Sequence, residues 1–262
     1  MAYHSIRFLV RDHVAHVVLN RPANANSINA DVAKELLRAA IDCDESPNVR
    51  AVLIRGEGPM FSGGGDLKTF VGKGDALPAY LKETTTYLHG AISRFVRQSA
   101  PVVCAVHGFA AGGGFSLAIA SDLVVAAKSA KFTMAYTKAG LTPDGSSTYF
   151  LPRLVGLRRA MDLALTNRVL TADEALDWGL VSRVTGDDEL RDVAESLAKT
   201  LAGGATWALG KAKNLLHTGT TESLETQMEF ETRAIADSVR TEDGKEGVSA
   251  FVSKRKPVFR GR

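Results

Sequence analysis

Apolar and polar residues alternate along the first part of the chain. The segments Ile6–Val10 and Val14–Leu19 have a period of two, which is typical of β-strands, and Arg11-Asp12-His13 between them predicts a hairpin turn. The pattern changes at Asp31–Cys43, where apolar residues recur at helical spacing. Val49–Ile54 is nearly all apolar, as expected of a strand buried on both faces. Helix followed by buried strand predicts an α/β fold.

The longest uncharged passage runs from Gln98 to Ser121. It predicts a strand at Val102–Val106, a turn at Gly112-Gly113-Gly114 and a buried helix at Phe115–Ala120. A membrane span needs about 20 apolar residues in unbroken helix, and Pro101 and the three glycines interrupt this passage. Two interpretations remain open. The passage is either a plain buried strand, turn and helix, or one whose exposed backbone N–H groups also bind a negatively charged oxygen.

The rest of the chain continues the same mixture of helices and short strands. Ser146 or Ser147 is expected to cap the helix that follows the loop Gly140–Ser147, and Thr171 to Glu174 has the form of a capping box. From Asp187 onward only helices are expected. The remaining expected elements are helices at Pro78–Gln98, Arg158–Thr166, Thr206–His217 and Glu222–Val239, and strands at Leu123–Ala127, Phe132–Met134 and Leu180–Val184.

The composition is that of an ordinary soluble protein. The 262 residues are 45% hydrophobic and 23% charged, enough for one large domain or one domain with a small appendage. A net charge of +3 is too small to argue for nucleic acid and suits an anionic small molecule. Only Cys43 and Cys104 are present, and the first residues do not resemble a signal peptide. We therefore expect a cytoplasmic protein with no membrane or nucleic-acid partner.

Glycine-rich loops invite a nucleotide-binding interpretation, but the required motifs are missing. The sequence contains no GxGxxG and no GxxxxGK[ST]. The nucleophile motif GxSxG is absent too, since Gly114-Phe115-Ser116-Leu117-Ala118 lacks the closing glycine. The six histidines are dispersed, so no metal site is expected.

Two glycine-rich loops each follow a buried strand and can bring backbone N–H groups together, as an oxyanion hole requires. The first, Phe61 to Leu67 (FSGGGDL), resembles the FSAGADL signature of the enoyl-CoA hydratase/isomerase (crotonase) superfamily. The second, His107 to Gly114 (HGFAAGGG), resembles the superfamily's NG-x-AxGGG signature. The resemblance extends over essentially the whole chain, including Leu19 to Pro22, Ala172 to Val181 and Glu246 to Lys256.

The resemblance implies a fold and an assembly. It implies a spiral of ββα units with a C-terminal helical trimerisation region, so that residues 1–186 form the core with the acyl-CoA site and residues 187–262 form the oligomerisation region. The implied partners are an acyl-CoA thioester substrate and further copies of the chain, in a homotrimer or a dimer of trimers. No separate cofactor is implied, because coenzyme A is part of the substrate.

The resemblance also implies the site residues. The backbone N–H groups of Gly65 and Gly113 would hold the thioester oxygen. The positions that match the path of coenzyme A, pantetheine and substrate are Ala23, Ala25, Gly63, Asp66, Leu67, Lys68, Gly112 and Tyr136. The substrate's acyl group cannot be read from the sequence, and its pocket is expected along Gly72–Ala91.

The implied reaction depends on three positions. Hydratases of the superfamily use two glutamates to activate water, and the matching positions here are Ser116 and Tyr136, neither of which is a general base near neutral pH. Asp144 provides a carboxylate. The alternative interpretation is that it only forms a Pro-Asp-Gly turn and takes no part in a reaction. The segment Lys131–Arg153 resembles the phenylacetate-pathway enoyl-CoA isomerases, whose matching aspartate is the catalytic acid/base. Double-bond isomerisation with Asp144 is therefore the leading hypothesis.

Three alternatives remain. One is enoyl-CoA hydration, in fatty-acid or aromatic-acid degradation, with a different water site. A second is 4-chlorobenzoyl-CoA dehalogenation, in which the matching aspartate is a nucleophile and His89 matches a helper histidine; the preferred interpretation of His89 is a partly buried helix residue. Against dehalogenation, Tyr136 replaces the tryptophan beside that nucleophile and Gly65 replaces an aromatic residue. The third is a non-catalytic member that binds CoA or RNA.

Overall fold

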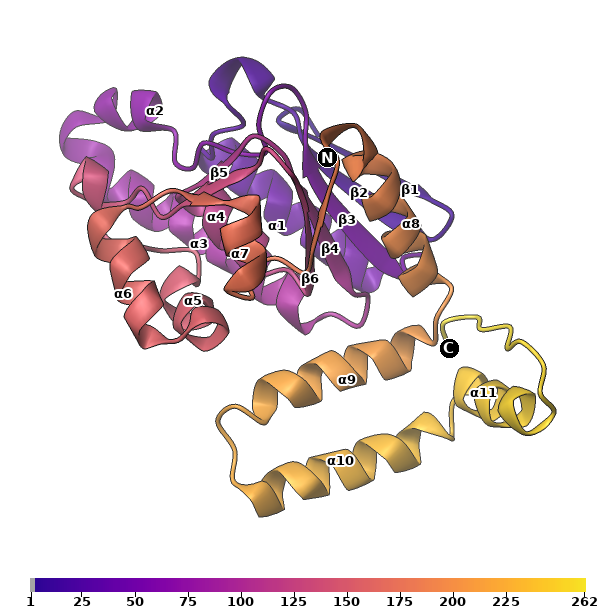
Figure 1. The fold of residues 1–262 in the computed structure, drawn as a ribbon. Helices are drawn as coiled ribbons and strands as arrows, with labels where there is room; N and C mark the ends of the chain where they lie inside the picture. Colours follow the sequence, from indigo (N-terminus) through magenta and orange to yellow (C-terminus); the bar gives the residue numbers. More distant parts are fainter. Residues whose placement is uncertain (1–2) are drawn as a thin grey trace.

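A six-stranded sheet forms the centre of the protein, which is described here for residues 3–262 by a computed structural model (Figure 1). The strand order is β1-β2-β3-β4-β6-β9, and all neighbours are parallel except the β1–β2 hairpin. Asp12 and His13 make its turn with positive φ angles of 51° and 63°. The strands are β1 (Ile6–Arg11), β2 (Val14–Leu19), β3 (Ala51–Gly56), β4 (Val102–Val106), β6 (Leu123–Ala127) and β9 (Arg183–Thr185). The predicted α/β fold is confirmed.

A second, smaller sheet accompanies the main one. It contains β5 (Phe109–Ala111), β7 (Lys131–Thr133) and β8 (Leu170–Thr171) in the order β5-β7-β8. Isolated bridges between Ile28 and Gly65 and between Ser62 and Ala110 continue its edge. After each of the strands β2, β3, β4 and β6 the chain therefore passes through a short extended segment before it reaches a helix. This is the predicted spiral of ββα units.

Helices cover the sheet and account for its apolar strands. Helix α1 packs along α3 and contacts β1 and β2, whereas α8 packs across β2, β3, β4 and β6, and Figure 1 shows them on opposite sides of the sheet. Strands covered on both faces must be apolar throughout, and β2 and β4 are buried at every position. The helices are α1 (Ala30–Glu45), α2 (Leu67–Val71), α3 (Leu77–Arg97), α4 (Gly113–Ile119), α5 (Ser147–Val155), α6 (Leu157–Thr166), α7 (Ala172–Asp177), α8 (Leu190–Ala202), α9 (Thr206–Thr218), α10 (Leu224–Ser238) and α11 (Glu242–Val252).

One of the two predicted helix caps is confirmed in full, and the other is confirmed only in its position. Thr171 Oγ1 accepts a hydrogen bond from the Glu174 amide and Glu174 accepts from the Thr171 amide, which is the predicted capping box. Ser146 occupies the N-cap position of α5, as predicted, but no side chain caps this helix. Ser146 has a left-handed φ of 68° and makes no capping hydrogen bond, and the Ser147 hydroxyl donates to the Asp144 carbonyl at 2.8 Å. Both hydroxyls donate to carbonyls of the loop before the helix.

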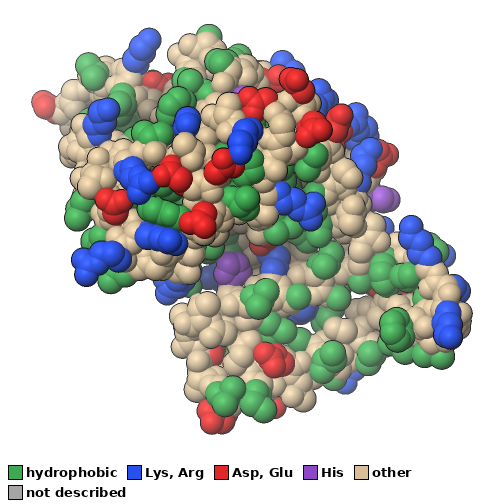
Figure 2. All heavy atoms as spheres, in the orientation of Figure 1, with side chains coloured by type: hydrophobic (Ala, Val, Ile, Leu, Met, Phe, Trp, Pro, Cys, Tyr) green, Lys and Arg blue, Asp and Glu red, His purple; other side chains and the backbone are tan. Residues whose placement is uncertain are grey.

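The last three helices extend away from the sheet. Figure 1 shows α9 and α10 as an antiparallel pair below the core, with α11 beside them. Many large apolar side chains on these helices are exposed, and Figure 2 shows hydrophobic side chains gathered on this part of the surface. They include Leu216, Leu224, Met228, Ile235, Val239, Phe251 and Val252. The division into residues 1–186 and 187–262 stays a prediction. Within residues 3–262 no helix is long and apolar enough to cross a membrane.

Candidate active site

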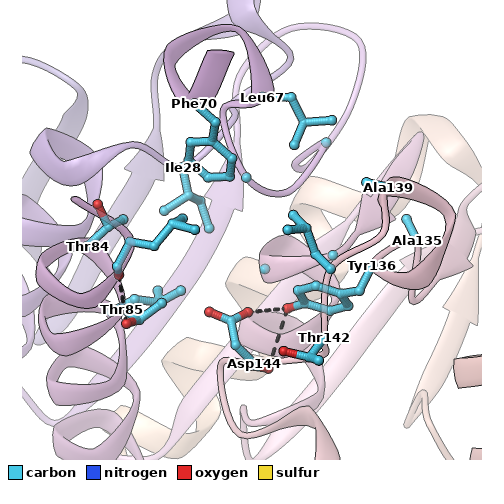
Figure 3. Close-up of a pocket in the computed structure, with 17 residues that line it drawn as sticks. Ile28, Leu67, Phe70, Thr84, Thr85, Ala135, Tyr136, Ala139, Thr142 and Asp144 are labelled. Carbon is cyan, nitrogen blue, oxygen red and sulfur yellow. Dashed lines mark hydrogen bonds between the residues drawn. The ribbon is translucent and has the colours of Figure 1, made fainter. Parts of the chain in front are cut away.

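A cavity of about 290 Å³ lies where the loops after β3, β4 and β7 meet helices α2 and α3. Figure 3 shows its two walls, with α3 on one side and the segment that carries Tyr136 and Asp144 on the other. Its apolar lining includes Ile28, Leu67, Phe70, Leu81, Leu88, Ala135 and Leu141, and its polar side chains are Thr84, Thr85, Tyr136, Thr142 and Asp144. Among the described residues that line the cavity, Asp144 is the only carboxylate.

The two glycine-rich loops touch each other at the cavity. Gly64 has a φ of +92°, and a Cβ atom there would lie 2.8 Å from the Ala111 carbonyl oxygen and 3.2 Å from the Gly112 Cα. A Cβ atom at Gly114 would lie 2.4 Å from the Ser62 Cβ. Only glycine allows this close approach, which the bridge between Ser62 and Ala110 holds in register.

The contact leaves two backbone N–H groups free. Gly65 and Gly113 both line the cavity. Within residues 3–262 neither amide has a hydrogen-bond acceptor, although the neighbouring amides of Gly64, Asp66 and Gly112 do. Free amide donors in a cavity wall can bind a carbonyl oxygen that gains negative charge.

Asp144 is held by a compact network of hydroxyl groups. The Tyr136 hydroxyl donates to Asp144 Oδ1 at 2.6 Å, as the dashed line in Figure 3 marks. Ser116 Oγ lies 2.8 Å from that hydroxyl and donates to the Asp144 carbonyl at 3.0 Å. Ser116 is fully buried on α4. The two positions that match the hydratase glutamates therefore both contact Asp144.

The environment keeps Tyr136 protonated. Burial, followed by the neighbouring Asp144 carboxylate, raises the pKa of Tyr136. Because the phenol keeps its proton, it remains a donor to Oδ1 throughout the ordinary pH range.

His89 lies beside Asp144, a contact that only the resemblance to the dehalogenases suggested. Its Nε2 is 3.1 Å from the Gly145 amide nitrogen, which donates to it, and 3.6 Å from Asp144 Oδ2. The His89 side chain is 49% exposed. The expected partly buried helix histidine is thus also a neighbour of the single carboxylate.

The structure brings together only part of the predicted set. Gly63, Gly65, Leu67, Gly112, Gly113, Tyr136 and Asp144 line the cavity, and Leu81, Thr84, Thr85 and Leu88 contribute the expected wall from 72–91. Ala23, Ala25, Asp66 and Lys68 lie outside it. Lys68 is exposed on α2, whereas the Ala25 carbonyl accepts from the Gly63 amide at 2.8 Å.

Asp66 has a structural environment. It is 5% exposed, accepts from Arg21 at 2.9 Å, and caps α2 by accepting from the Thr69 amide at 3.1 Å. Burial opposes its ionisation, but the Thr69 amide and the Arg21 guanidinium together lower the pKa of Asp66. The pair therefore fixes α2 at the cavity rim.

Within residues 3–262 no group of His, Cys, Asp and Glu side chains is arranged to hold a metal ion.

Comparisons with known proteins find relatives of a single family along nearly the whole chain. The sequence profile described as enoyl-CoA hydratase/isomerase matches residues 10–262. A 1,2-epoxyphenylacetyl-CoA isomerase of Escherichia coli is 37% identical over 97% of both chains. A 4-chlorobenzoyl coenzyme A dehalogenase of an Arthrobacter species is 34% identical over 96% of this chain and 91% of that one. The crystal structure of an enoyl-CoA hydratase from a Polaromonas species is 30% identical and superposes with a TM-score of 0.93 over 97% of this chain and 99% of that one.

Proposed function

The chain belongs to the enoyl-CoA hydratase/isomerase family, and from that membership we propose that this enzyme moves a double bond within an enoyl-CoA, with Asp144 as its single acid/base. The observation that carries the proposal is the composition of the cavity: one carboxylate, Asp144, shares it with the two free amides of Gly65 and Gly113. One base and one site for negative oxygen are what this isomerisation needs.

Each of these residues has its own role in the proposed reaction. The thioester oxygen binds to the amides of Gly65 and Gly113. The Asp144 carboxylate removes a proton from C2, the carbon between the thioester and the double bond of the 3-enoyl-CoA, and the enolate oxygen forms between the two amides. The same carboxyl group then returns a proton at another carbon. Tyr136 holds Oδ1, so Oδ2 is the oxygen that accepts and returns the proton.

The test is the conversion of a 3-enoyl-CoA to the conjugated 2-enoyl-CoA, followed by the ultraviolet absorbance of the conjugated thioester. Asp144→Asn keeps the shape of the side chain but removes the base, so kcat is expected to fall by about a hundredfold or more. Asp75→Asn, an exposed aspartate on the surface near α3, is the matched control. Unchanged turnover in Asp144→Asn contradicts the proposal.

Hydration is the second candidate reaction. The Ser116–Tyr136–Asp144 network could hold a water molecule beside the carboxylate. However, a general acid/base pair is missing, since the cavity holds one carboxylate among its described lining residues. Rapid hydration of crotonyl-CoA by the purified protein would place hydration ahead of isomerisation.

Dehalogenation of an aryl-CoA is favoured by one observation, the position of His89 at 3.6 Å from Asp144, together with the similarity to the Arthrobacter dehalogenase. Chloride release from 4-chlorobenzoyl-CoA tests it directly. Binding of CoA or RNA without turnover of any thioester would instead indicate a non-catalytic member.

We also propose the assembly that membership suggests, a trimer or a dimer of trimers in the cytoplasm. The exposed apolar side chains of α9–α11 support it, because a monomer would leave them in water. Light scattering of the purified chain tests the proposal. The positions Ala23, Ala25, Asp66 and Lys68 stay proposals for the CoA-binding path.

A further inference from the structure

The two oxygens of the Asp144 carboxyl group have different surroundings. Oδ1 accepts the hydrogen bond of Tyr136 at 2.6 Å. Oδ2 has the His89 ring as its neighbour, with Nε2 at 3.6 Å. A proton taken up by Asp144 therefore resides on Oδ2, next to a second group that can accept it.

His89 stands between two hollows of the protein. Asp144 lines the substrate cavity, whereas His89 lines a separate cleft of about 770 Å³ between α3, α5 and α9. The cleft is partly polar, with Ser93, Arg97, Asn214 and His217 in its walls. About half of the His89 side chain is exposed. The ring thus connects the carboxyl group of one hollow with the water of the other.

The hydrogen bond from Gly145 shows how such a connection can operate. Nε2 accepts from the Gly145 amide only while it carries no proton. Protonation of Nε2 breaks this bond and leaves an N–H that is attracted to the Asp144 carboxylate and free to turn toward the cleft. One proton can therefore be held either by Asp144 Oδ2 or by His89 Nε2. When Nε2 holds it, the ring no longer accepts the hydrogen bond from Gly145 and can rotate.

We infer that His89 is a positioning residue that carries the proton of Asp144 to and from the water of the second cleft. The inference rests on the proposed isomerisation. In that reaction the C–H bond of the substrate breaks and an O–H bond forms on Oδ2. The proton then passes to Nε2, the ring exchanges it with water in the cleft, and a solvent proton returns through Nε2 to Oδ2 before the new C–H bond forms. The proton added to the product comes from solvent, even though bound substrate fills the cavity.

Deuterium incorporation tests the inference. Isomerisation of 3-hexenoyl-CoA is run in D₂O to low conversion, and the product is analysed by mass spectrometry. Wild type is expected to add solvent deuterium in most turnovers. His89→Gln keeps an acceptor for the Gly145 amide but cannot carry a proton, so deuterium incorporation should fall by at least about fivefold while kcat changes less. Ser93→Ala, one turn further along α3 in the same cleft, should behave as wild type.

The outcomes separate this inference from the proposed function. Equal deuterium incorporation in wild type and His89→Gln, or retention of the substrate proton by wild type, overturns the role of His89 and leaves the isomerisation intact. Exchange of the α-protons of phenylacetyl-CoA in D₂O provides a second readout that needs no double-bond migration. Exchange that depends on both Asp144 and His89 without isomerisation would overturn the proposed reaction and support the proton path. Equal α-proton exchange in wild type and His89→Gln would overturn the path.

Discussion

The Tyr136 hydroxyl donates to Asp144 Oδ1 at 2.6 Å and to no other carboxylate within residues 3–262. This hydrogen bond fixes the rotation of the only carboxyl group among the described residues that line the cavity. Tyr136 is a neutral donor at a position where the resemblance to hydratases of the family implies a glutamate. The carboxyl group of Asp144, which we propose as the acid/base, is thereby held in one orientation.

Tyr136→Phe should therefore reduce isomerase activity without abolishing it. The ring still fills the wall of the cavity, but Asp144 loses its orientation and one charge-assisted hydrogen bond, which is worth about 2 kcal/mol. We expect a fall of about tenfold to thirtyfold in kcat, with a smaller change in KM. Tyr149→Phe, on the exposed surface of α5, is the control, and equal activity of the two variants would contradict the role of Tyr136.

The raised pKa of Tyr136 predicts a difference in stability at alkaline pH. Because the folded state holds the phenolic proton more tightly than the unfolded chain, this group stabilises the fold fully below the unfolded pKa of 10.0, and the stabilisation is lost as pH rises above it. The free energy of unfolding, measured with urea at about pH 8 and about pH 11, should therefore fall more in wild type than in Tyr136→Phe. A parallel fall in both proteins would show that Tyr136 is not the responsible group.

The contact between the glycine loops predicts a severe effect of a single methyl group. Gly64→Ala places a Cβ atom 2.8 Å from the Ala111 carbonyl oxygen in a left-handed backbone conformation, a strain of about 1–3 kcal/mol. The loops must separate, which displaces the amides of Gly65 and Gly113, and kcat should fall by about a hundredfold. Gly72→Ala is the control, since its Cβ would meet nothing closer than 3.5 Å. Full activity of Gly64→Ala would show that the loop contact does not position the amides.

The fold was predictable where the sequence pattern reflects burial. Both glycine loops and Asp144 carry motif residues. Strands β2 and β4 are apolar, except for the buried His16 in β2, because helices cover them. The strand predicted at Leu180–Val184 begins instead at Arg183, because Leu180 and Val181 are buried in the turn after α7, where both amides bond to the Ala175 carbonyl. The strands β5 and β8 are two or three residues long and leave no periodic signal.

The site was only partly predictable for a similar reason. His89 and Gly145 are 56 positions apart, and no local pattern connects a histidine on the exposed side of a helix with a loop amide. Ser116 and Tyr136 were expected as substitutions for glutamate, but their hydrogen bonds to Asp144 depend on the approach of α4 to the loop after β7. Such contacts follow from packing between distant segments.

The Arg21–Asp66 pair predicts a loss of stability in acid. The pKa of Asp66 is lowered, so the carboxylate stabilises the fold above its unfolded value of 3.8, and the stabilisation is lost as pH falls through the lower folded value. Asp66→Asn should lower the free energy of unfolding by about 2 kcal/mol near neutral pH, with a difference from wild type that shrinks toward about pH 3. Urea unfolding at both pH values measures it. A constant difference would mean that the charge of Asp66 is not responsible.

The attachment of α9 to the core depends on a buried ion pair. Lys213 Nζ lies 2.7 Å from Asp122 Oδ2 and donates to the Phe95 carbonyl at 3.1 Å, while Asp122 also accepts from the Val102 amide at the start of β4. Lys213→Met removes one partner and leaves Asp122 with an uncompensated charge, because the two side chains are only 9% and 15% exposed. The variant should be destabilised by about 3 kcal/mol. Lys211→Met, two residues earlier on the exposed face of α9, should change the free energy of unfolding by less than about 0.5 kcal/mol. Urea unfolding of the two variants decides between a buried pair that holds α9 in place and one that contributes nothing.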